Sequence, residues 1–265
     1  MNSTEIIFVI DKSGSMANLV SDTIGGFNGF IKSQQALDGK ATLTTVVFDT
    51  TWKIVHDGVD IHEVKQMTTA DYSAFGGTAM LDAIGEVINR VQDRHDELGV
   101  EKPDSVLFVI TTDGEENSSH QFTKSQIEKM IKHQTNGHGW KFMFLGANMD
   151  AVKEAASIGI DCSYAHTYDY TAKGVLDTYT TMSAVAASVR CDALADDFDL
   201  SRAYTDCAVN SNMGSADVVT SATFNADFDP AAISAIDASI AKIDIDAISN
   251  AVADSILTTT LEAKI

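Results

Sequence analysis

The chain contains four short, mostly apolar runs that alternate with segments of helical periodicity. The runs lie at residues 5–10, 41–48, 105–112 and 140–146. Strands that are apolar on both faces are typical of parallel sheets covered on both sides by helices. The pattern therefore predicts an α/β fold with a doubly wound, mostly parallel sheet.

Five further segments carry the spacing expected of helices. They lie at 21–37, 79–98, 123–134, 150–158 and 171–190. The third opens with a threonine followed three residues later by glutamine, which is the pattern of a capping box. Each of the three connections between the apolar runs therefore contains a predicted helix that can cover the sheet.

The segment at 51–59 interrupts this alternation. It follows the second apolar run after a turn too short to hold a crossover helix. We therefore expect an antiparallel strand at the edge of the sheet. His56 and Asp57, near the end of this segment, are expected to be exposed turn residues.

Charge and cysteine content restrict the class of partner and the compartment. The net charge of −20 over 265 residues argues against nucleic acid or an anionic membrane as the main partner. The apolar stretches are shorter than the ~20 residues of a membrane helix, and no basic, apolar leader precedes Glu5. Cys162, Cys191 and Cys207 lack a metal-binding spacing and are expected to be reduced thiols. We therefore expect a cytoplasmic protein, or a virion component if a phage encodes it.

The composition changes after Arg190, because 191–265 hold 13 acidic side chains and only 3 basic ones. We therefore divide the chain into a domain at 1–190 and an acidic C-terminal extension at 191–265. Alternating residues predict a small strand region at 215–226, and Asp229-Pro230 predicts the start of an amphipathic helix at about 230–257. Its apolar stripe consists of Ile233, Ile236, Ile240, Ile243, Ile248, Val252 and Ile256. This helix is expected either to pack on its own chain or to dock on a partner, a second copy or a larger assembly.

Oxygen-bearing side chains follow two of the predicted strands and precede one predicted helix. The sequence Asp11-Lys-Ser13-Gly-Ser15 comes directly after the first apolar run, and Asp113 follows the third. Thr78 follows a double glycine at the start of a helix. The carboxyl ends of parallel strands lie at one edge of a sheet, where α/β proteins bind ligands. Hard oxygen donors of this kind suit Mg²⁺ or Mn²⁺ better than zinc. Taken singly, each residue could equally cap a helix or form a turn.

Together the five residues resemble the metal-ion-dependent adhesion site of the von Willebrand factor A domain. The resemblance covers roughly residues 4–190, in the correct order. The phrases that start at Asp22, Thr112 and Phe144 look like the single-domain bacterial and bacteriophage branch of that family. The resemblance implies that Ser13 and Ser15 bind the cation directly and that Thr78 does so directly or through water. It also implies that Asp11 and Asp113 act mainly through water and hydrogen bonds.

The function implied by the resemblance is metal-dependent protein binding without catalysis. A cation held by neutral hydroxyls keeps much of its positive charge, so a Glu or Asp of a protein partner would complete its coordination. The expected cation is Mg²⁺, with Mn²⁺ or Ca²⁺ as alternatives. Glu115 and Glu116 are expected either to add an outer carboxylate to the site or to form a solvated loop face.

Two other functions remain open. The domain could be an adaptor in a larger assembly, such as a virion, attached through 191–265. A metal-dependent phosphoryl hydrolase is the less favoured alternative. The chain has no Gly-x-x-x-x-Gly-Lys-Ser/Thr phosphate loop and no carboxylate two positions after Asp11.

Overall fold

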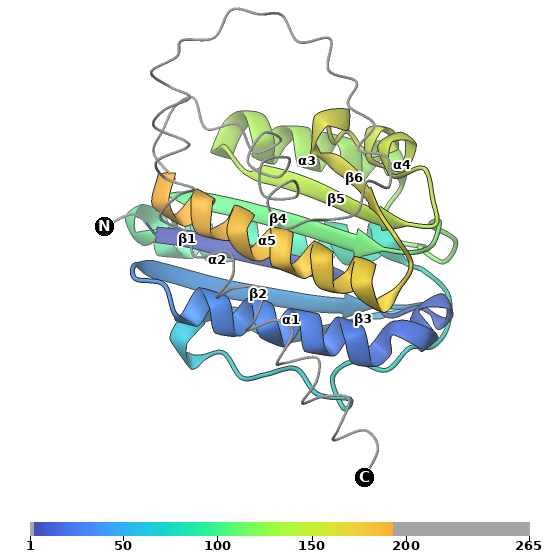
Figure 1. Cartoon of the computed structure of the whole chain (residues 1–265). Coiled ribbons are helices and arrows are strands. Elements are labelled where there is room, and N and C mark those ends of the chain that lie inside the picture. The colour runs from blue at the N-terminus through green and yellow to red at the C-terminus, as the bar shows by residue number, and fades with distance from the viewer. Residues whose placement is uncertain (1–2, 193–265) are drawn as a thin grey trace, which may run out of the picture.

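A six-stranded sheet forms the centre of the protein, with the strand order β3-β2-β1-β4-β5-β6 (Figure 1). The computed structural model describes residues 3–192. The strands are β1 (Ser3–Asp11), β2 (Lys40–Phe48), β3 (Trp52–Asp60), β4 (Ser105–Thr112), β5 (Lys141–Ala147) and β6 (Ala165–Tyr168). Neighbouring strands are parallel except for β2 and β3, which pair antiparallel at one edge.

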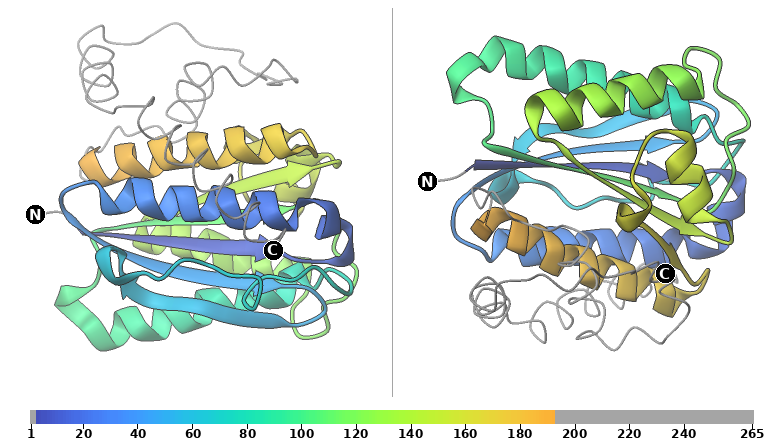
Figure 2. Two further views of the ribbon diagram at one scale, coloured as in Figure 1. Left: turned by 60° about the horizontal axis from the view of Figure 1, so that its bottom comes forward. Right: turned by 90° about the horizontal axis from the view of Figure 1, so that it is seen from above.

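Helices cover both faces of the sheet, as Figure 2 shows. They are α1 (Val20–Gln35), α2 (Met80–Leu98), α3 (Lys124–His138), α4 (Ala151–Ser157) and α5 (Ala172–Asp192). One hydrophobic cluster joins the sheet to α1 and α5. The other joins it to α2, α3 and α4. The protein is therefore a three-layer α/β structure with a core on each side of the sheet.

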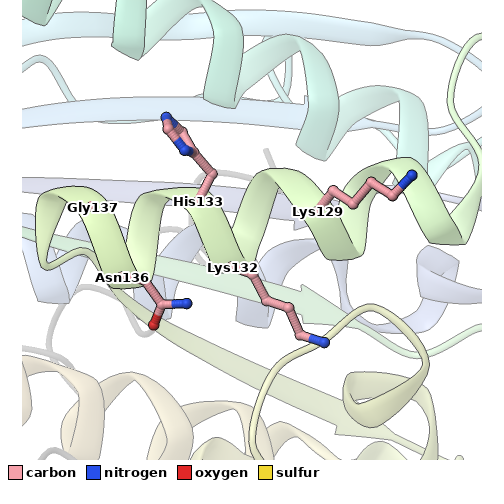
Figure 3. A pocket seen from close by; sticks show the side chains of 5 residues that line it. All are labelled: Lys129, Lys132, His133, Asn136 and Gly137. Carbon is pink, nitrogen blue, oxygen red and sulfur yellow. The ribbon is translucent and has the colours of Figure 1, made fainter.

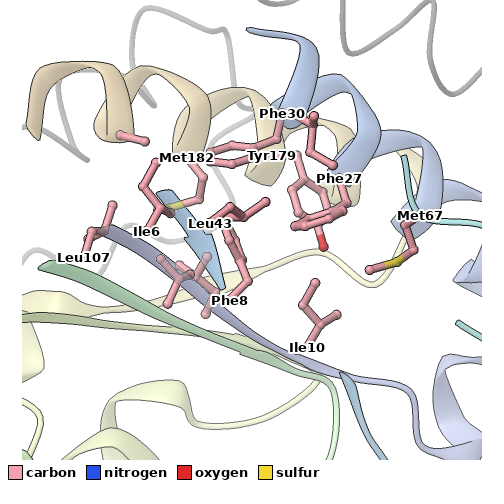
Figure 4. Packing of buried hydrophobic residues seen from close by; sticks show 14 of the residues in the cluster. Ile6, Phe8, Ile10, Phe27, Phe30, Leu43, Met67, Leu107, Tyr179 and Met182 are labelled. Atoms are coloured by element: carbon pink, nitrogen blue, oxygen red, sulfur yellow. The ribbon is translucent and has the colours of Figure 1, made fainter. Parts of the chain in front are cut away.

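The alternation of side chains along β1 explains why both cores form. Ile6, Phe8 and Ile10 belong to the cluster under α1 and α5 (Figure 4), whereas Ile7 and Val9 belong to the opposite one. All five side chains are fully buried. Each such burial contributes about 1.5–3 kcal/mol, so the five apolar side chains of β1 stabilise the cores on both sides of the sheet.

The structure confirms the doubly wound, mostly parallel α/β fold and the antiparallel edge strand. The capping box of α3 is present, with Thr123 and Gln126 as its two partners. The β6 strand was not predicted, because it has only four residues, of which Ala165 and Tyr168 alone are buried, and they form no apolar run. The expectation for His56 was wrong: β3 continues through it, and its ring is buried against Phe27 with Nε2 2.9 Å from the Lys65 carbonyl.

The strand region predicted at 215–226 and the helix predicted at 230–257 lie outside the described residues. The division of the chain at residue 190 therefore stays a prediction. Between residues 3 and 192, none of the helices combines the length and the apolar character needed to cross a membrane.

Candidate metal centre

The ends of two neighbouring parallel strands define the site. Strands β1 and β4 pair in parallel with Ile10 opposite Thr111. Asp11 is the last residue of β1, and Asp113 comes directly after the end of β4. The sheet order brings these two carboxylates to one edge although they are far apart in the sequence.

The hydroxyl groups lie against one another and against Asp113. The Oγ atoms of Ser13 and Ser15 are 3.0 Å apart. The Ser15 hydroxyl donates a hydrogen bond of 2.6 Å to Oδ1 of Asp113. A Cβ atom built on Gly114 would lie 3.3 Å from Thr78 Oγ1 and 3.9 Å from Ser15 Oγ. The structure therefore brings the serine hydroxyls, the Thr78 hydroxyl and Asp113 together around Gly114.

Asp11 is buried beneath these hydroxyls. It is 0% exposed, and both of its carboxylate oxygens accept hydrogen bonds. Oδ1 accepts from the Ser13 backbone N–H at 2.7 Å, and Oδ2 accepts from the Thr112 hydroxyl at 2.6 Å. The Tyr72 hydroxyl donates to the Asp11 carbonyl at 2.6 Å. Asp11 therefore fixes the turn that carries Ser13.

Burial has a clear electrostatic effect on both carboxyls. It raises the pKa of Asp11 to about 6, although the hydrogen bonds from Thr112 and Ser13 act in the opposite direction. Burial also raises the pKa of Asp113, against the hydrogen bond from Ser15. These hydrogen-bond donors are all neutral. A cation bound at this edge would therefore stabilise the two ionised carboxylates.

Lys12, which lies between Asp11 and Ser13 in the sequence, has its ammonium group paired with a carboxylate other than Asp11 or Asp113. The Lys12 ammonium forms an ion pair with Asp49, which follows the end of β2. The Lys12 backbone N–H donates to the Phe48 carbonyl at 2.7 Å, so the same turn is also fixed to β2. Lys12 therefore neutralises Asp49 in this arrangement.

Glu116 has a role that neither expectation for it included. Its Oε1 accepts from the backbone N–H groups of Ser118 and Ser119, at 2.9 and 2.8 Å. Its Oε2 accepts from the Leu81 N–H and the Ser119 hydroxyl, both at 2.9 Å. The carboxylate thus ties the loop after β4 to the first turn of α2. Glu115, in contrast, is exposed.

Asp82 makes the second tie between the same two segments. It is 6% exposed, and its carboxylate accepts from the backbone N–H groups of His120, Gln121 and Phe122 at 2.8–2.9 Å. The Asn117 side chain adds a third, because its Oδ1 accepts from the Thr78 N–H at 2.9 Å. Thr78 and Asp113 are therefore held in fixed relative positions by three side chains.

The donor set fits a hard divalent cation. Within residues 3–192, no group of three or more His, Cys, Asp or Glu side chains is arranged to hold a metal. The site at the ends of β1 and β4 instead offers hydroxyl and carboxylate oxygens, which are the donors preferred by Mg²⁺, Mn²⁺ and Ca²⁺. The serine hydroxyls can rotate their hydrogens away from one another and present lone pairs instead.

Strand order, the antiparallel edge strand and the convergence of the five motif residues agree with the resemblance found in the sequence. The fold is von Willebrand factor A-like. Comparison of the sequence with protein-family models and with curated proteins gives no match. Similarity is found instead with solved structures of low sequence identity.

One similar structure is a von Willebrand factor type A protein from Catenulispora acidiphila, at 16% identity and a TM-score of 0.49, covering 70% of this chain and 43% of that chain. A second is the mussel byssus proximal thread matrix protein 1 with a zinc-occupied metal-ion-dependent adhesion site. It has 16% identity and a TM-score of 0.49, and the match covers 70% of this chain and 46% of that chain. A third is the manganese-loaded Plasmodium vivax TRAP protein, with 18% identity and a TM-score of 0.45. The match covers 67% of this chain and 73% of that chain. The A-like chain thus spans less than half of the first two proteins.

Two hollows in the described part of the chain are lined by residues other than the five site residues. A shallow hollow of about 470 Å³ lies along α3 and is lined by Lys129, Lys132, His133, Asn136 and Gly137 (Figure 3). A small cavity of about 10 Å³ lies among Met16, Thr23, Thr111, Tyr168, Val175, Thr178 and Tyr179.

Sequence reasoning missed the side chains that support the site. Thr112 and Tyr72 hold Asp11, and Asp82, Glu116 and Asn117 hold the loop beside Thr78. The signal for Thr112 was present, since a polar residue at the end of an apolar strand needs a partner when both faces are covered. No comparable signal marked Tyr72.

Proposed function

We propose that the A-like domain is a non-enzymatic module that binds a protein partner through a divalent cation. Ser13, Ser15 and Thr78 would hold the cation, and Asp11 and Asp113 would support it through hydrogen bonds and water. We propose Mg²⁺ as the physiological ion, with Mn²⁺ and Ca²⁺ as alternatives. The observation that carries the proposal is the contact of the Ser13, Ser15 and Asp113 oxygens, at 3.0 and 2.6 Å.

The chemistry of the cation would be to attract a carboxylate, because neutral hydroxyl ligands leave most of its charge unneutralised. This chain's own residues would provide the rigid support. The buried Asp11 orients the turn that carries Ser13, and Asp113 accepts a hydrogen bond from the Ser15 hydroxyl. We propose that a Glu or Asp of the partner supplies the remaining ligand. The net charge of −20 supports a protein partner over nucleic acid or an anionic membrane.

The position of Asp11 also supports binding over phosphoryl transfer. A nucleophilic aspartate needs a free oxygen that can reach its substrate. Both oxygens of Asp11 already accept hydrogen bonds, and the residue is 0% exposed. The geometry therefore favours a supporting role for Asp11.

Calorimetric titration of the protein with Mg²⁺ or Mn²⁺ tests metal binding. We expect one site in the wild-type protein, and loss of that site in Ser13→Ala and Asp113→Ala. Ser163→Ala is the matched control, because Ser163 is exposed and its hydroxyl bonds Asp161 outside the site. Unchanged titration of both site variants would contradict the proposal.

Partner binding requires a second experiment. The immobilised protein is incubated with extract from its native source in Mg²⁺, then in EDTA. We expect a retained protein to be released by EDTA and to be absent from Ser13→Ala. Retention that withstands EDTA and is the same for the variant would show that the cation does not mediate partner binding.

A further inference from the structure

Phe75 is a large apolar side chain that is exposed beside the candidate metal centre. It is 76% exposed, and it is the only aromatic among the large hydrophobic residues exposed in the described part of the chain. The others, Leu98 and Val100, lie at the end of α2 and in the turn before β4, at the opposite edge of the sheet. Single exposed apolar residues are common on proteins. The position of Phe75 therefore matters more than its exposure.

Backbone contacts place Phe75 against the turn that carries the serines. Its N–H donates to the Lys12 carbonyl at 2.9 Å, and the Gly14 N–H donates to the Gly76 carbonyl at 3.0 Å. Thr78 follows Phe75 by three residues. The segment between β3 and α2 returns to the edge where β1 and β4 end, as Figure 1 shows. Phe75 therefore stands at the rim of the site.

The segment that presents Phe75 is anchored on both sides. Tyr72 is 0% exposed and donates its hydroxyl to the Asp11 carbonyl. The N–H of Ala79 donates to the Asp49 carbonyl at 2.7 Å. The backbone on either side of Phe75 is thus fixed before any partner arrives. An aromatic side chain on such a support loses little conformational entropy on binding, which is the property of residues that dominate interfaces.

We propose that Phe75 contacts the protein partner, and that this partner carries an apolar side chain within a few residues of the Asp or Glu at the metal. This inference rests on the proposed function, because it takes the partner carboxylate as given. The two contacts have different roles. The partner carboxylate makes binding depend on the cation, whereas the apolar contact adds affinity and selects among acidic segments.

A random library of short displayed peptides tests this inference without knowledge of the natural partner. The library is selected on the immobilised full-length protein in Mg²⁺ and eluted with EDTA. We expect recovered sequences to be enriched in Asp or Glu, with an apolar residue nearby. On Phe75→Ser the acidic enrichment should persist, and the apolar enrichment should disappear.

Affinity measurements on the best synthetic peptide provide the quantitative test. We expect Phe75→Ser to weaken its binding at least about tenfold, as for a residue at the centre of an interface. Phe75→Tyr should retain binding. Val100→Ser is the matched control, since Val100 is 100% exposed at the opposite edge, and it should bind as the wild type does.

The outcomes separate the two claims. Acidic peptides without an apolar preference, or the same preference on Phe75→Ser, would overturn the role of Phe75 and leave the proposed function standing. Failure to recover any acidic peptide with EDTA would overturn both.

Discussion

Replacing Thr112 by valine should weaken the site from beneath. Thr112 is 0% exposed, and its hydroxyl donates to Asp11 Oδ2 at 2.6 Å and accepts from the Gly114 N–H at 3.2 Å. Valine keeps the shape of the side chain and removes both bonds. A hydrogen bond to a charged group is worth about 1.5–3 kcal/mol, and the bond from Gly114 about 1 kcal/mol. We expect Thr112→Val to lower the free energy of unfolding by about 2.5–4 kcal/mol.

Thr45 offers a matched control for this substitution. It is also a threonine at 0% exposure in a strand of the sheet, but its hydroxyl has no hydrogen-bond partner among the described residues. A buried hydroxyl without a partner is costly, so Thr45→Val should leave stability unchanged or raise it by about 1 kcal/mol. The two variants make the same chemical change, but only Thr112→Val is predicted to lower the free energy of unfolding. Urea denaturation without added metal measures the difference.

Metal affinity gives the second readout for the same pair of variants. Side chains that orient the ligands of a metal typically cost 10–100-fold in affinity when removed, so we expect a loss of about that size in Thr112→Val. Thr45→Val should titrate with Mn²⁺ as the wild type does. Equal stability and equal Mn²⁺ affinity in the two variants would refute the role assigned to Thr112 in supporting Asp11.

Two further predictions concern other buried or clamped side chains. Glu116→Gln should lower the free energy of unfolding by about 2–3 kcal/mol, because an amide in place of either oxygen faces two N–H or O–H donors. The exposed neighbour Glu115 serves as the control, and Glu115→Gln should change the free energy of unfolding by no more than about 0.5 kcal/mol in the same urea titration. Equal effects of the two variants would contradict the role of Glu116 in tying the loop after β4 to α2. Burial lowers the pKa of His166 to about 4. The contribution of the neutral His166 side chain to the free energy of unfolding is therefore fully present above the pKa of about 6.5 in the unfolded chain. It is lost as pH falls towards 4. Between pH 7 and pH 4.5, His166→Gln should lose about 2–3 kcal/mol less stability than the wild type, and parallel pH profiles would exclude this role.

The sheet and most helices were predictable because burial on both faces leaves a simple pattern. The runs around Phe8 and Phe108 have no polar interruption, which is typical of a parallel strand covered on both faces. The β6 strand was not predictable, since its pairing with β5 is decided by tertiary contacts. His56 was misjudged for a related reason: its burial depends on Phe27, a residue of α1 distant in sequence.

The candidate site divides in the same way. Strand order and the direction of parallel strands were enough to predict that Asp11 and Asp113 share an edge. The hydrogen bonds of Glu116 and Asp82 were not predictable, because they depend on the conformation of the loop after β4. Loop geometry follows from local backbone contacts that leave no periodic signal in the sequence.

We propose that the hydroxyls of Ser13, Ser15 and Thr78 hold a divalent cation. Crystals grown with Mn²⁺ and measured at the manganese absorption edge would show whether they do. We expect one strong anomalous peak within bonding distance of the Ser13 and Ser15 hydroxyl oxygens, and no such peak in crystals of Ser13→Ala. A wild-type structure in which those oxygens still contact one another, with no peak beside them or a peak elsewhere only, would contradict this proposal.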